Sequence, residues 1–138
     1  MPRIVALDVG DATIGVAAAD ELNITVNPVR TIRRGKSVRA DLREVESLLD
    51  ELDAGKVVVG MPLDAEGQEG PQARKVGDFV ERLARRLRIP VETWDERFST
   101  ADAEEMLLMA DVSRAKRGEI IDQAAAMVIL RSYLDSRA

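Results

Sequence analysis

Three acidic residues, far apart in the sequence, stand in surroundings where a charged side chain is unusual. Asp8 ends a wholly apolar run, Glu96 follows the end of another short predicted strand, and Asp122 lies within EIIDQAAAMVILRSYL, which leaves little polar face on a helix. A carboxylate removed from water without a partner is costly, so it shifts its pKa or binds a cation. We therefore expect these three acids to be functional.

Each acid taken alone also has a purely structural explanation. Asp8 could form a turn over the amides near Gly10, Glu96 could pair with Arg97, and Asp122 could favour the first turn of a helix. Taken together they favour a site, because ligands of α/β sheets gather at the carboxyl ends of parallel strands. A final helix packed across that edge would bring in Asp122.

Three converging carboxylates repel one another, so at least one stays protonated unless cations neutralise them. Ligands that are all oxygen point to Mg²⁺ or Mn²⁺ rather than to zinc or copper. A pair of such ions, about 3.5–4 Å apart, activates a water and stabilises the leaving oxygen of a phosphodiester. We expect Asp8, Glu96 and Asp122 to be both the metal ligands and the catalytic residues.

Length and composition exclude several other kinds of site. A chain of 138 residues has the size of one compact domain, so we expect a single domain over residues 1–138. The absence of His and Cys excludes Ser–His–Asp and Cys–His catalysis, zinc fingers and disulfide frameworks. The net charge of −5 argues against a general nucleic-acid coat protein, although local basic patches remain compatible with it.

No apolar run is long enough to span a membrane, and the N-terminus lacks the layout of a signal peptide. The expected location is therefore the cytoplasm, without membrane association.

The elements that must position the acids follow from apolar patterning. Pro28 marks the third strand as an edge strand, and Ser37 is the expected N-cap of the first helix, with Gly55 as its stop. Strands are predicted at 4–7, 14–18, 24–32, 56–60 and 91–94, and helices at 37–53, from Pro71 onward, at 99–110 and at 119–134, with a polar loop at 111–118.

This order predicts a mixed five-stranded sheet with helices on both faces: a three-strand antiparallel meander plus two parallel strands. Ribonuclease H-like and actin/sugar-kinase-like folds share this arrangement, and element order alone does not choose between them. A kinase of that class also needs a second domain, for which 138 residues leave no room, and it normally has a hydroxyl where this chain has Ala12.

Four segments of the chain resemble the YqgF/RuvX family: ALDVGDATIGVAAAD, VVVGMPLDAEGQEGPQARKVGDFVERL, DERFSTADAEEMLL and IIDQAAAMVILRSYLD. The resemblance covers nearly the whole chain, and the first and third segments together are specific. Members of this family are ribonuclease H-like proteins described as candidate Holliday-junction resolvases and pre-16S rRNA nucleases.

The resemblance implies a ribonuclease H-like fold with its acidic triad at Asp8, Glu96 and Asp122. It also implies metal-dependent hydrolysis of phosphodiester bonds, in 16S rRNA 5′-end maturation or in Holliday-junction resolution. We expect Gly10 and Gly60 to line the substrate. The chain departs from the family pattern at Thr13, where Arg is usual, and also at Ala19 and at Phe98-Ser99.

Basic residues near the proposed site would bind the backbone of RNA or branched DNA. We assign this role to Arg97 and to a cluster of Arg114, Lys116 and Arg117, for which a solvated charge run is the alternative. With four aromatic residues in the chain, a base-stacking platform is not expected, and recognition of backbone and shape is favoured.

Two alternatives remain open at this point. The chain could be a non-catalytic ribonuclease H-like module that docks onto nucleic acid or protein. It could also act as a homodimer, because symmetric cleavage of a junction needs two active sites.

Overall fold

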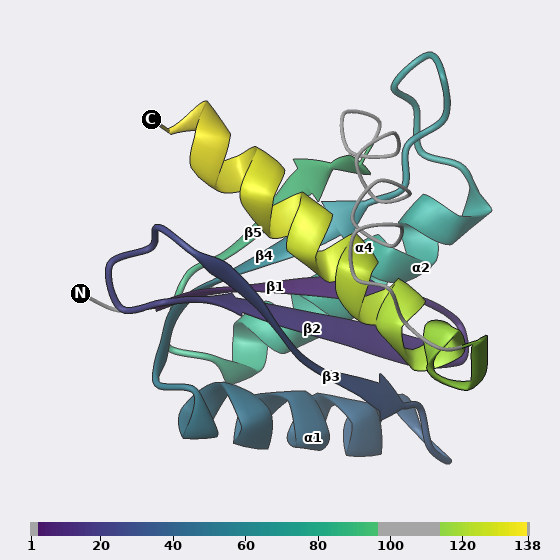
Figure 1. Ribbon diagram of the computed structural model, residues 1–138. Coiled ribbons are helices and arrows are strands. Elements are labelled where there is room, and N and C mark those ends of the chain that lie inside the picture. Colours follow the sequence, from purple (N-terminus) through teal and green to yellow (C-terminus); the bar gives the residue numbers. More distant parts are fainter. Residues whose placement is uncertain (1–2, 97–113, 138) are drawn as a thin grey trace.

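A five-stranded mixed sheet runs through the computed structural model, which describes residues 3–96 and 114–137, with only the backbone of 114–121 (Figure 1). The strands lie in the order β3-β2-β1-β4-β5. β1 pairs antiparallel with β2 and parallel with β4; β2 pairs antiparallel with β3, and β4 parallel with β5. The bounds are β1 Arg3–Val9, β2 Thr13–Ala19, β3 Val26–Arg33, β4 Ala54–Met61 and β5 Val91–Asp95. The predicted meander with two parallel strands is thus confirmed.

Helices cover both faces of the sheet, as predicted. The helices α1 (Val38–Glu51) and α2 (Pro71–Arg86) lie on one side, and α4 (Arg114–Ser136) crosses the other (Figure 1). Strand alternation divides the core accordingly: Leu7 and Val59 pack in the cluster under α1 and α2, whereas Ala6 and Val58 pack under α4. Successive side chains of each strand therefore face different helices.

Local signals account for most of the boundaries. The Ser37 hydroxyl accepts a hydrogen bond from the Ala40 amide at 3.1 Å, which makes it the predicted N-cap of α1. Pro71 opens α2, where its missing N–H costs nothing. Pro28 lies on edge strand β3 beside a register shift, as its lack of an amide donor requires.

Two predicted boundaries are wrong. Gly55 does not stop α1: the helix ends at Glu51, the chain reverses at Asp53 with φ of 53°, and Gly55 already belongs to β4. The expected polar loop up to Gly118 is also too long, because α4 begins at Arg114. Gly118 suggested a break, but one glycine costs a helix only about 1 kcal/mol.

The helix predicted at 99–110 lies outside the described residues. Within the described ranges, no helix combines the length and apolar character needed to cross a lipid bilayer.

Candidate functional site

The site is centred on Asp8, which faces α4 from the middle of the sheet. Asp8 pairs with Gly15 of β2, and the register of Leu7 with Val59 puts Gly60 of β4 beside it on the other side. All three residues face α4, because the residues directly before and after each of them pack in the cluster under α1 and α2. The acid thus stands between two positions that have no side chain.

Gly60 makes room for Glu96. A Cβ placed on Gly60 would overlap Oε1 of Glu96 and Cδ1 of Ile129. Glu96 directly follows β5, and its side chain reaches over β4 to hydrogen-bond with Asp8. The expected meeting of these two acids at the strand ends is therefore present, and Gly60 lies beside them. The expected contact of Gly60 with the substrate stays a prediction.

Gly15 makes room for Asp122 in the same way. A Cβ there would overlap the backbone carbonyl of Asp122, so the glycine lets α4 lie directly against β2. Asp122 stands eight residues after the start of α4, which removes the explanation that it serves the first turn of the helix. Sequence reasoning missed Gly15; the signal for it was a glycine inside a strand, which often marks a close backbone approach.

Thr13 fixes the direction of the third acid. Its Oγ1 donates a hydrogen bond of 2.8 Å to Oδ2 of Asp122. The family that the chain resembles usually has arginine at the position of Thr13. In this chain the residue contacts the acidic site itself.

Burial and mutual repulsion raise the pKa values of Asp8 and Glu96. Burial raises the pKa of Glu96 to about 8, with the charge of Asp8 and its hydrogen bond adding to the effect. The pKa of Asp8 is also raised, first by burial and then by the charge of Asp122, while the hydrogen bond from Glu96 opposes the shift. At neutral pH, Glu96 therefore holds the proton that it shares with Asp8.

The donor set fits a hard divalent cation. Its acidic ligands are carboxyl oxygens, and a cation bound between Asp8 and Glu96 would replace the proton that their raised pKa values favour. Within the described residues, no group of three acids is yet arranged around a single point, and Thr13 holds one oxygen of Asp122. For one ion to bind all three ligands, the three carboxyl groups would have to move closer together.

The other predicted substrate-binding residues lie in different parts of the chain. Gly10 lies in the turn between β1 and β2, where its amide donates to the Thr13 carbonyl at 2.8 Å. Arg114, Lys116 and Arg117 belong to the first turns of α4 rather than to a loop, and their side chains are not described. Arg97 lies outside the described residues. The substrate role of all five positions stays a prediction.

Comparison with known proteins gives the same family as the motifs. The chain matches the RuvX family, described as Holliday junction resolvase, over residues 2–136. A relative from Desulforamulus reducens is 46% identical over 99% of this chain and 98% of its own length, and one from Symbiobacterium thermophilum is 49% identical over 99% and 94%. Both are named as candidate pre-16S rRNA nucleases.

Solved structures support the fold. RuvC of Thermus thermophilus in complex with a Holliday junction aligns with a TM-score of 0.62 and 17% identity, over 99% of this chain and 96% of that one. A second structure of Thermus thermophilus RuvC aligns with a TM-score of 0.56 and 14% identity, over 98% and 95%. At these identities the likeness concerns the ribonuclease H-like fold alone. On the evidence of the match over nearly its whole length, the chain belongs to the RuvX family.

Proposed function

We propose that this protein is a metal-dependent nuclease that hydrolyses phosphodiester bonds in nucleic acid. The observation that carries the proposal is the placement of Asp8 between Gly15 and Gly60. Because these glycines have no side chain, Asp122 can lie over Gly15 and Glu96 over Gly60, on opposite sides of Asp8. A carboxyl pair that shares a proton in a buried site is costly to ionise unless a cation arrives. Family membership supports the same class of reaction.

Asp8, Glu96 and Asp122 would hold the ions, Mg²⁺ or Mn²⁺, and a pair of ions is expected. Bound there, the metal would lower the pKa of a water and neutralise charge on the phosphate. Glu96 would release its proton to accept a cation, and Thr13 would keep Asp122 oriented. The chain has no His, so the nucleophile is not activated by an imidazole.

Two nucleic acids are candidates for the substrate. The names of the relatives point to precursor 16S rRNA, and the family description points to branched DNA. Cleavage of a junction in both arms would require a homodimer with two sites, so the oligomeric state on each substrate belongs to the test.

The test is a cleavage assay of the purified chain with precursor 16S rRNA, single-stranded RNA and four-way junction DNA, each with Mg²⁺, Mn²⁺ or a chelator. We expect metal-dependent cleavage that is lost in Asp8→Asn and in Asp122→Asn. Asp50→Asn, an exposed acid on α1 outside the acidic site, is the matched control and should cut at the parent rate. Binding without cleavage by the parent would instead identify a docking module, and equal cleavage by the triad variants would refute the site.

A further inference from the structure

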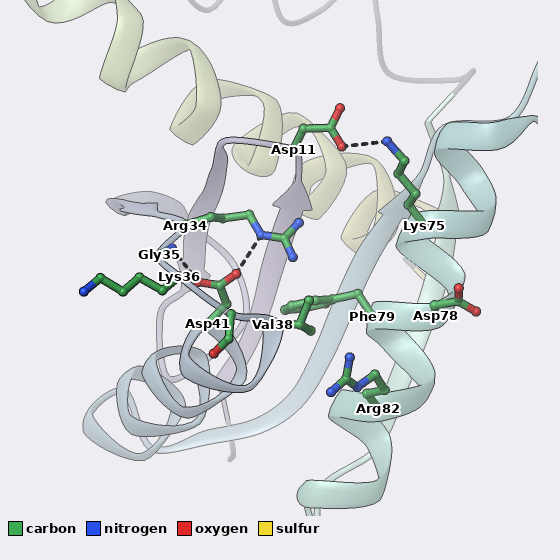
Figure 2. A pocket seen from close by; sticks show the side chains of 11 residues that line it. Asp11, Arg34, Gly35, Lys36, Val38, Asp41, Lys75, Asp78, Phe79 and Arg82 are labelled. Carbon is green, nitrogen blue, oxygen red and sulfur yellow. Dashed lines mark hydrogen bonds and ion pairs between the residues drawn. The ribbon is translucent and has the colours of Figure 1, made fainter.

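A cavity of about 510 Å³ opens at the same end of the sheet as the acidic site, on the side of α1 and α2. Its lining comes from the turn after β1, from the connection between β3 and α1, and from α2 (Figure 2). The turn that contains Gly10 and Asp11 separates the two sites, because Asp8 faces α4 whereas Phe79 of the cavity packs in the other half of the core. A nucleic-acid strand that crosses this turn would contact both the acidic site and the cavity.

Arg34 is held rigidly at the centre of the cavity. Its Nε donates to Asp41 at 2.9 Å and its Nη1 donates to the Gly10 carbonyl at 2.8 Å. The guanidinium lies over the Phe79 ring, 5.3 Å from its centroid. Asp41 is 4% exposed and also accepts from the Gly35 amide at 2.8 Å, so its charge is compensated within the protein. Arg34 and Asp41 form an ion pair, so the site presents a pre-oriented guanidinium donor whose ordering cost is already met in folding, rather than an unpaired cation.

Two further cations flank Arg34. Lys75 and Arg82 are seven residues apart on α2 and thus lie on one face of the helix. Figure 2 shows Lys75 at the rim beside Asp11 and Arg82 at the opposite end of the cavity, while the Asp78 carboxylate points away from Arg34. Lys36 adds a fourth positive charge to the lining.

The contact of Lys75 with Asp11 is easily exchanged. It measures 3.4 Å, and both side chains are about two-thirds exposed (65% and 68%). An exposed ion pair of this kind contributes little free energy. A phosphate, which carries charge on several oxygens, would compete well with a single carboxylate for this lysine.

We propose that this cavity binds a phosphate group of the nucleic-acid backbone, on the strand whose neighbouring phosphodiester lies at the acidic site. The proposal rests on the proposed function, because the strand is the substrate of that site. A fixed Arg between two mobile cations suits a phosphate diester. The contact would hold the strand in register across the turn rather than read its sequence.

The test measures binding of labelled single-stranded RNA and of four-way junction DNA to the full chain in a chelator, across a salt series. Lys75→Gln with Arg82→Gln removes two cavity charges, both on α2. The control, Arg43→Gln with Arg85→Gln, removes one exposed charge from α1 and one from α2, both outside the cavity. We expect the cavity variant to bind about tenfold more weakly. Its log–log salt slope should flatten by roughly 0.7–0.9 for each lost contact. The control variant should keep the slope of the parent.

A second pair of variants tests whether binding becomes tighter when an acidic partner of a basic residue is removed. Asp11→Asn frees Lys75 and should tighten binding, whereas Glu81→Gln, which frees Arg85 outside the cavity, should not.

Equal salt slopes for the cavity and control variants would overturn the proposal while leaving the nuclease intact. Cavity-dependent binding without cleavage would keep the contact between the cavity and the nucleic-acid backbone but refute the nuclease. If inorganic pyrophosphate protects the cavity lysine from chemical labelling and nucleic acid does not, the ligand is a free phosphate and the assignment to a backbone is wrong.

Discussion

The hydroxyl of Thr13 donates a 2.8 Å hydrogen bond to the carboxylate of Asp122, across 109 positions of sequence. The bond ties the first residue of β2 to the helix that closes the site. Hydrogen bonds to charged groups contribute more than neutral ones, about 1.5–3 kcal/mol. Thr13 is therefore a positioning residue for the third acid.

Thr13→Val removes this donor and keeps the shape of the side chain. We expect cleavage to fall roughly tenfold at low Mg²⁺ and to recover in part at high Mg²⁺, because a free Asp122 carboxylate costs ordering when it binds the ion. Rates measured over a Mg²⁺ series would show this. Thr31→Val is the matched control, since Thr31 accepts a hydrogen bond from the neighbouring Gln123 at 3.3 Å. An Mg²⁺ dependence shared by both variants would contradict the positioning role.

Gly15→Ala should destabilise the protein, because the new methyl group would overlap the backbone of Asp122, which cannot turn aside as a side chain can. Overpacking of this kind costs about 1–3 kcal/mol. Urea denaturation should register the loss. Gly77→Ala on α2, where a Cβ meets nothing within 4 Å, should be neutral or stabilising. Similar unfolding midpoints for the two variants would mean that α4 does not lie against Gly15.

Gly60→Ala should act on the site more than on the fold. The new methyl group would meet the ends of the Glu96 and Ile129 side chains, which can move. Glu96 would then lose its contact with Asp8, so divalent-ion affinity should fall severalfold with a smaller change in stability than in Gly15→Ala. Calorimetric metal titration and urea denaturation on the same preparations would separate the two effects. Unaltered metal affinity would place Glu96 outside the site.

The metal-free protein should lose stability as pH rises from about 4.5 to about 8. Folding raises the pKa of Glu96 from 4.5 to about 8, so over that interval the folded state holds a proton that the unfolded chain releases, and each pH unit costs up to about 1.4 kcal/mol. Thermal unfolding in a chelator at several pH values would measure the slope. Glu96→Gln, which cannot ionise, should flatten it. A parent protein that gains stability across this interval would contradict the shared proton.

The pairing of Asp8 with Glu96 could be predicted because it needs only parallel strands and an acid at the end of each. The N-cap at Ser37 and the edge position of Pro28 were equally local signals. The role of Gly15 could not be predicted, since it depends on how closely α4 packs against β2, which is a property of tertiary structure. The start of α4 was missed because Gly118 carries a small penalty that the long apolar helix outweighs.

The most direct test of the central claim is a calorimetric titration of the metal-free protein with Mn²⁺ near neutral pH, in two buffers of different ionisation enthalpy. We predict binding whose heat depends on the buffer, because the cation displaces the proton that Glu96 holds beside Asp8, and no binding in Asp8→Asn. Binding that Asp8→Asn leaves unchanged, or no binding by the parent protein, would contradict the claim that these acids form a metal site.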